Sequence, residues 1–168
     1  MKASTNQIDI TLTVNGTEVT ESVPVRMHAA DFIRQVLGLT GTHVGCEQGV
    51  CGMCTIRVNG AVVKSCLVLA VQLDGADVET VESLSDGDRL SLLQETFKRH
   101  HALQCGFCTP GFLMVAKQLE EREGTLTDAE IRDEISGVLC RCTGYEGIVR
   151  AISDYLAAAR TAATEPAA

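Results

Sequence analysis

Three cysteines lie close together in a glycine-rich stretch of the chain, and a fourth follows at a distance. Cys46, Cys51 and Cys54 have the spacing C-x4-C-x2-C, and Cys66 comes next along the chain. This is the spacing of the plant-type loop that binds a [2Fe–2S] cluster through four thiolates, two on each iron. A loop that wraps three thiolates around so small a cage must turn sharply, which the intervening glycines permit. The sequence therefore predicts that these four residues, here called the N-terminal cysteine set, bind an iron–sulfur cluster.

A second group of four cysteines, here called the C-terminal cysteine set, forms two close pairs. Cys105 and Cys108 have the spacing C-x2-C, and Cys140 and Cys142 have the spacing C-x-C. Each pair falls in a predicted connection between helices. If the four helices pack as two antiparallel hairpins, both connections can meet at one end of the bundle. The helix that starts at Pro110 would then direct its positive end toward an anionic cluster. The two sets use all eight cysteines, so we predict a second [2Fe–2S] cluster here.

Zinc is the alternative metal, because C-x2-C pairs are common in four-thiolate zinc sites. It remains open for the C-terminal set taken alone, although C-x-C is an unusual zinc pair. It fits the N-terminal set less well, because three ligands of that set come from a single loop. Disulfides are a further alternative, but the polar N-terminus has no apolar segment typical of a signal peptide. We therefore expect a cytoplasmic protein, whose thiols bind metal rather than each other.

The composition favours two small domains and argues against several classes of partner. The chain has 168 residues, of which 4% are aromatic, and no Trp, so its core must consist of smaller apolar side chains that bound clusters would help to stabilise. The net charge of −8 argues against nucleic acid, which requires a basic face. No apolar run approaches the length of about 18 residues that a membrane span needs. We expect neither a nucleic-acid partner nor a membrane span.

The first half of the chain has the pattern of a small α+β domain. Alternating apolar residues predict strands, and the dipeptides Asn15-Gly16 and Asn59-Gly60 predict tight hairpin turns between them. The predicted strands cover residues 8–14, 17–25, 55–58, 61–64 and part of 68–81. A helix is predicted over residues 29–37. We predict that this first domain comprises residues 1–82, with Cys66 carried back toward the loop by the second hairpin.

The second half has a purely helical pattern after a polar linker over residues 82–88. Thr109 is predicted to cap a helix that begins at Pro110, and Thr127 and Glu130 form the sequence of a capping box. The predicted helices run from about Leu90 to Phe97, Pro110 to Glu121, Asp128 to Leu139 and Ile148 to Leu156. We predict an all-α domain over residues 83–168, so the fold class of the whole chain is α+β.

Three motifs in a fixed order are more specific than either cysteine set. They are Gly45–Cys54, Leu103–Gly111 and Leu139–Tyr145. Together they closely resemble the iron–sulfur subunit of the molybdenum hydroxylases, the family of xanthine dehydrogenase, aldehyde oxidoreductase and carbon monoxide dehydrogenase. The resemblance covers residues 6–158 and implies a plant ferredoxin-like β-grasp domain followed by a four-helix bundle domain. Met53 departs from the family, in which Ala or Ser is more frequent.

The resemblance also implies a role as one subunit of a larger oxidoreductase. The sequence has no Ser/His/Asp arrangement and no phosphate-binding loop, so we expect this subunit to have no catalytic site of its own. A large subunit would carry molybdopterin, in a dinucleotide form, and a medium subunit would carry FAD, within a dimer of heterotrimers. Electrons from a substrate hydroxylated with water-derived oxygen would pass to the helical-domain cluster, then to the ferredoxin-like cluster, and then to FAD. Gln104 matches the glutamine that hydrogen-bonds the pterin, and Cys142 matches the ligand nearest the amino group of the pterin.

Two other functions remain open at this point. One is a free-standing two-cluster ferredoxin-like carrier, although such a carrier has no need of the helical half. The other is a redox-sensing or metal-sensing module with zinc or labile clusters. The substrate of the larger enzyme is not encoded in this chain. The motifs are closest to those of bacterial three-subunit hydroxylases of N-heteroaromatic compounds, with carbon monoxide and aldehydes as alternatives.

Overall fold

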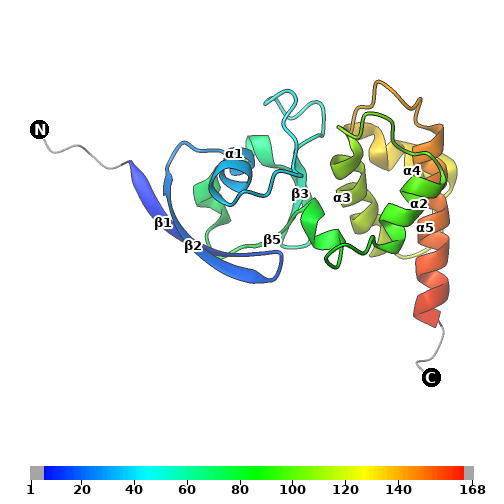
Figure 1. Ribbon diagram of the computed structural model, residues 1–168, viewed down its shortest axis with the longest axis horizontal. Coiled ribbons are helices and arrows are strands. Elements are labelled where there is room, and N and C mark those ends of the chain that lie inside the picture. Colours follow the sequence, from blue (N-terminus) through cyan, green and yellow to red (C-terminus); the bar gives the residue numbers. More distant parts are fainter. Residues whose placement is uncertain (1–5, 165–168) are drawn as a thin grey trace, which may run out of the picture.

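The computed structural model describes residues 6–164, and their side chains as far as residue 162. Figure 1 shows a sheet with short helices in the N-terminal half, beside a group of helices that make up the C-terminal half. Each half has its own cluster of buried apolar residues. The α+β fold class that the sequence predicts is confirmed.

The sheet has five strands in the order β2-β1-β5-β3-β4. The strands are β1 (Gln7–Val14), β2 (Thr17–Pro24), β3 (Thr55–Val58), β4 (Ala61–Lys64) and β5 (Asp77–Glu79). Two antiparallel hairpins are joined through β5, which runs parallel to β1 and antiparallel to β3. The turns have φ values of 50° and 79° at Asn15-Gly16, and 50° and 82° at Asn59-Gly60. Positive φ at both positions is the type I′ geometry that these dipeptides favour.

One face of β1 forms the floor of the N-terminal core. Ile10, Leu12 and Val14 are buried, whereas Ile8 is 49% exposed. Ile8 lies near the N-terminal end of β1, before the residues that form this core. The alternation of apolar residues over residues 8–14 therefore corresponds to a buried face from Ile10 onward, but not at Ile8.

The predicted helix over residues 29–37 forms in an irregular way. It begins as α1 (Ala29–Asp31) and continues over Phe32–Val36 with the wider bonding of a π-helix. The N–H of Leu37, for example, donates to the carbonyl of Phe32 at 3.1 Å. Phe32 and Ile33 are fully buried in the N-terminal core, so the change in winding keeps the apolar face of this segment on the sheet.

The C-terminal half contains the four helices that the sequence predicts. They are α2 (Leu92–Arg99), α3 (Thr109–Glu120), α4 (Asp128–Glu134) and α5 (Glu146–Thr164). The Thr127–Glu130 capping box is present at the start of α4. The predicted boundary between residues 82 and 83 lies within a 3-10 turn over Val81–Leu84, whose apolar side chains pack against the helical core.

Three predicted helix ends are wrong. The hydroxyl of Ser91 accepts from the N–H of Gln94 and begins α2 later than expected, which leaves Leu90 outside the helix and 46% exposed. The N-cap of α3 is Cys108 rather than Thr109. After α4, the chain forms a 3-10 turn over Ile135–Gly137 and then becomes extended, so Leu139 is not helical and is 44% exposed.

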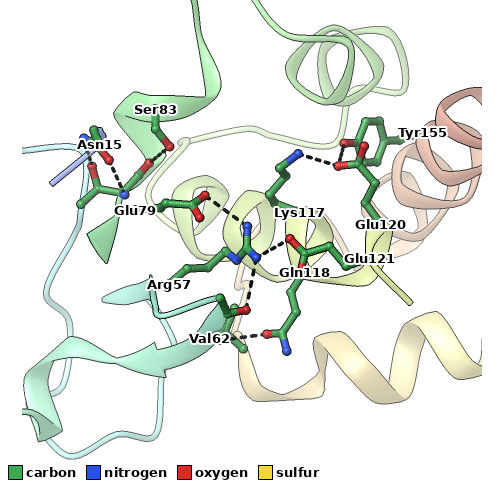
Figure 2. A network of polar contacts seen from close by, with 12 residues as sticks. Asn15, Arg57, Val62, Glu79, Ser83, Lys117, Gln118, Glu120, Glu121 and Tyr155 are labelled. Carbon is green, nitrogen blue, oxygen red and sulfur yellow. Dashed lines mark hydrogen bonds and ion pairs between the residues drawn. The ribbon is translucent and has the colours of Figure 1, made fainter. Parts of the chain in front are cut away.

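A buried arginine joins the two halves along the contact between β3 and α3 (Figure 2). Arg57 is only 4% exposed, and its guanidinium bonds Glu79 of β5 at 3.1 Å and Glu121 at the end of α3. Next to it, the N–H of Val62 donates to the side-chain oxygen of Gln118 at 2.9 Å. These bonds hold the far end of α3 against the sheet, at a distance from the cysteines that precede β3 and α3.

Candidate metal centre

The β3–β4 hairpin brings the N-terminal cysteine set together. Its register pairs Thr55 with Lys64, so Cys54 and Cys66 lie just beyond the paired ends. The N–H and hydroxyl of Ser65 both donate to the carbonyl of Cys54, at 3.1 and 2.7 Å. The thiols of Cys54 and Cys66 are hydrogen-bonded to each other. Before β3, the loop turns at three residues with positive φ, namely Glu47, Gly49 and Gly52.

The other two thiols of this set form a second pair at the more exposed side of the loop. Cys46 is hydrogen-bonded to Cys51 and accepts N–H bonds from Cys51 and Gln48, each at 3.4 Å. These bonds lower the pKa of the Cys46 thiol to about 7. Burial and the neighbouring Cys54 instead raise the pKa of Cys66 to about 11. Because thiols bind metal as thiolates, a positive metal centre would have to displace the proton of Cys66.

The C-terminal cysteine set meets at one end of the helices, as the antiparallel packing predicts. The sulfur atoms of Cys105 and Cys142 are 3.6 Å apart and exposed. Cys108 and Cys140 form a buried pair joined by a hydrogen bond. Cys108 is the N-cap residue of α3, so the positive end of that helix lies at this set.

Backbone and hydroxyl groups act differently on the two buried thiols. Burial opposes ionisation of Cys140, but hydrogen bonds from Thr143 and from the N–H of Cys142 outweigh it and lower the pKa of Cys140. Burial and the adjacent Cys140 raise the pKa of Cys108 to about 12. Within the buried pair, Cys140 therefore ionises more readily than an ordinary thiol, whereas Cys108 would lose its proton on binding a metal.

Both sets fit a [2Fe–2S] cluster, because each consists of two pairs of thiols. A two-iron cluster needs two thiolates on each iron, and the pairs supply them. For two sulfurs bonded to one tetrahedral metal at about 2.3 Å, we expect a separation of about 3.8 Å, close to the 3.6 Å between Cys105 and Cys142. Among residues 6–164, no three or more His, Cys, Asp or Glu side chains are grouped in a way that could hold a single metal ion.

Gln104 lies on the exposed side of the C-terminal set. Its side-chain nitrogen donates to the carbonyl of Cys142 at 3.0 Å, and both residues are exposed. The structure thus brings together the two residues that the sequence singles out as neighbours of a pterin. The sequence does not identify Tyr145 as a residue of this site, yet its hydroxyl accepts from the N–H of Cys140 at 2.8 Å, and its φ is 69°.

The two cysteine sets are in direct contact through their loops. The N–H of Leu139 donates to the carbonyl of Cys51 at 2.9 Å, and a cavity of about 280 Å³ between the loops is lined by cysteines of both sets. Beside it, the rings of His43 and Phe107 stack with centroids 4.7 Å apart. Met53 is the residue that departs from the pattern of the family named above. It belongs to the N-terminal loop, but its side chain is buried in the core of the helical half.

Two glycines make this approach possible. A Cβ atom on Gly111 would lie 2.4 Å from the carbonyl oxygen of Gly52, and one on Gly52 would lie 2.3 Å from that of Gly137. Such distances leave no room for a side chain. The sequence predicts the role of Gly52 in turning the loop, but not the packing of Gly111 against it.

None of the helices among the described residues combines the length and the apolar character that crossing a bilayer requires.

Two family models match the chain. The model described as "2Fe-2S iron-sulfur cluster binding domain" matches residues 12–91. The model described as "[2Fe-2S] binding domain" matches residues 80–153. Both descriptions favour iron–sulfur clusters over the zinc alternative.

Several known proteins are similar over nearly their whole length. The nicotine 6-hydroxylase small subunit of Paenarthrobacter nicotinovorans is 54% identical, over 89% of this chain and 90% of that protein. The caffeine dehydrogenase subunit gamma of Pseudomonas sp. (strain CBB1) is 52% identical, over 85% of this chain and 87% of that protein. Among solved structures, a chain of quinoline 2-oxidoreductase from Pseudomonas putida 86 superposes with a TM-score of 0.90. It is 52% identical and covers 94% of this chain and 98% of its own length.

Proposed function

We propose that this chain, which belongs to the iron–sulfur subunits of the molybdenum hydroxylases, transfers electrons during the hydroxylation of an N-heteroaromatic compound. Membership of the family rests on the two matched domains and on the relatives described above. The substrate class is supported by the names of those relatives, which refer to nicotine, caffeine and quinoline. In this proposal the chain contributes no catalytic residue and acts within a complex of several subunits.

The contact between the two cysteine sets is the observation that carries the proposal. The N-terminal set would hold one cluster and the C-terminal set the other, and each bound cluster would accept and release one electron at a time. Only a hydrogen bond and a short run of covalent bonds separate Cys51 of one set from Cys140 of the other. The stacked His43 and Phe107 pack beside this contact, so the chain itself fixes the separation of the two sites.

Exposure of the C-terminal set indicates where electrons would enter. Cys105 and Cys142 are exposed, whereas Cys46 and Cys51, the more accessible pair of the N-terminal set, are only partly exposed. Gln104 is exposed beside Cys142, so its amide can bind a pterin presented by another chain. Leu103, Phe107 and Leu139 are large apolar residues left exposed in the same loops. We propose that a large subunit carrying molybdopterin, in a dinucleotide form, covers this surface.

A second exposed apolar surface lies at the N-terminal set. Val50 is 62% exposed and Leu67, next to Cys66, is 63% exposed. Exposed apolar neighbours of a redox site are typical of an interaction surface. We propose that a medium subunit carrying FAD binds there, and that the whole enzyme is a cytoplasmic dimer of heterotrimers.

Purification of the chain from its native source, with whatever subunits accompany it, tests this proposal. We expect about four irons and four sulfides for each copy of the chain, since two [2Fe–2S] clusters contain that number. We also expect molybdenum and FAD on two larger subunits. Stoichiometric zinc in place of iron would contradict the iron–sulfur assignment. A chain that purifies alone with its full iron content would instead support the free-standing carrier.

A further inference from the structure

Lys64 bridges the loops that carry the two cysteine sets. Its ammonium group donates to the hydroxyl of Thr55 at 3.1 Å and to the carbonyl of Gly137 at 2.9 Å. Thr55 directly follows Cys54, and Lys64 itself lies two residues before Cys66. Gly137 belongs to the turn that leads into the C-terminal set. The ammonium group is therefore held in a fixed position next to the N-terminal cysteine set.

Among the described side chains, no carboxylate forms an ion pair with Lys64. Lys64 lies at the edge of a cleft of about 480 Å³ that Glu121 and Glu134 also line. Glu121 is paired with Arg57, and Glu134 is paired with Arg122. The positive charge of Lys64 is thus not balanced by a neighbouring acid.

The thiols of the N-terminal set lie in the surroundings of Lys64. Lys64 is partly buried, and the thiols of Cys54, Cys51, Cys66 and Cys46 are close enough to act on its charge. A partly buried lysine without a carboxylate partner lowers the stability of the folded protein, because its charge is partly removed from water. A bound anionic cluster would remove that cost by supplying the missing negative charge.

We propose that Lys64 sets the reduction potential of the N-terminal site, by placing one fixed positive charge beside it. The inference rests on the proposed function and adds a residue outside the eight cysteines to it. In the transfer between the sites, one electron leaves the C-terminal site and arrives at the N-terminal site, without a proton and without a change in any covalent bond. The arriving charge is stabilised by Lys64, so the electron equilibrium is displaced toward the N-terminal site.

The proposal is tested by measuring both potentials in the native assembly, by redox titration followed by electron paramagnetic resonance (EPR). Lys64→Met removes the charge, Lys64→Gln removes the charge but retains a hydrogen-bond donor, and Lys64→Arg retains the charge. Lys98→Met is the matched control, because Lys98 is an exposed lysine on α2. We expect both neutral variants to shift the equilibrium between the sites away from the N-terminal site on the order of tenfold, which is about 59 mV for a one-electron couple. Lys64→Arg should keep the wild-type potential.

The g-values of the EPR signals separate a charge effect from a change of structure. The account requires a lower potential of the N-terminal site with its g-values unchanged and with the C-terminal site nearly unaffected. Equal shifts at both sites, or a shift no larger than that of Lys98→Met, would overturn it. Loss of the cluster from both neutral variants would also overturn it and would leave Lys64 a structural residue. Absence of two signals from the wild-type assembly would instead refute the proposed function.

Discussion

The backbone N–H of Leu139 donates a 2.9 Å hydrogen bond to the carbonyl oxygen of Cys51. Leu139 directly precedes Cys140, so this bond connects a cysteine of each set through the main chain. Main-chain groups move little when their neighbours on both sides are packed, and here Val138 is fully buried. The two sites therefore have a fixed separation, which favours rapid transfer of single electrons between them.

Gln104→Leu should slow the reduction of the clusters by substrate without affecting their reduction by a chemical reductant. Its amide bonds the carbonyl of Cys142, and in the proposed function it also bonds the pterin. Loss of one hydrogen bond at this contact should slow substrate-dependent reduction by about tenfold. Stopped-flow absorbance of the native assembly measures the rate. Gln48→Leu is the control, because Gln48 is exposed beside the N-terminal set. Equal rates in the two variants would argue against a role for Gln104.

Gly111→Ala should destabilise the contact between the two halves. Its new methyl group would lie 2.4 Å from the carbonyl oxygen of Gly52, which forces α3 away from the N-terminal loop. We expect a loss of about 1–3 kcal/mol in the free energy of unfolding, as for other overpacked sites, measured by urea denaturation of the full chain. Gly137→Ala is the control, since the nearest atom to its new methyl group is the flexible end of Lys64 at 3.5 Å. A stability of Gly111→Ala equal to that of the control would contradict the packing.

Arg57→Met should weaken the attachment of α3 to the sheet. The guanidinium is buried, and its loss leaves Glu79 and Glu121 without their partner. Because both carboxylates are partly exposed, we expect a cost of about 1–3 kcal/mol, below that of a fully buried pair. Urea denaturation measures this loss of stability, and a faster proteolysis within residues 82–88 would show that the two halves separate more often. Arg122→Met removes a more exposed ion pair with Glu134 and should cost at most about 1 kcal/mol. An Arg57 variant as stable as this control would disprove the attachment.

Glu120→Gln should reduce the dependence of stability on pH in the acid range. Burial opposes ionisation of Glu120, but hydrogen bonds from Lys117 and Tyr155 outweigh it and hold the pKa of Glu120 below its usual value of 4.5 (Figure 2). A carboxyl whose pKa is lower in the folded state contributes stability above its unfolded pKa, and this stability is lost as the pH falls. The wild-type protein should therefore lose more stability than Glu120→Gln between about pH 5 and 3.

The control for this measurement is Glu123→Gln, a change at an exposed carboxyl in the following turn. Its unfolding free energy should follow the same pH dependence as that of the wild-type protein. If the unfolding free energy of Glu120→Gln changed with pH as steeply as that of this control, the hydrogen bonds to Glu120 would not favour its ionised form.

Local signals in the sequence predict the elements and the cysteine sets, because each signal is contained in a few neighbouring residues. The spacing of Cys46, Cys51 and Cys54 and the turn at Asn59-Gly60 are of this kind. Helix ends were less predictable. Thr109 has the residue type of an N-cap, but its hydroxyl is buried without a hydrogen-bond partner among the described atoms, because Cys108 occupies the capping position.

The contacts between the two halves were not predictable from the sequence. Arg57 and Glu121 are 64 residues apart, and Lys64 and Gly137 are 73 residues apart. No periodicity or spacing relates residues at such separations. Their proximity depends on how α3 packs beside β3, which only the folded structure shows.

Spin counting in the fully reduced native assembly tests the central claim most directly. The account predicts two spins for each copy of the chain, in two distinguishable S = ½ EPR signals, one from each [2Fe–2S] cluster. Cys142→Ser should change one signal, and Cys46→Ser should change the other. A single signal, or two signals that both respond to the same substitution, would contradict the assignment of one cluster to each cysteine set.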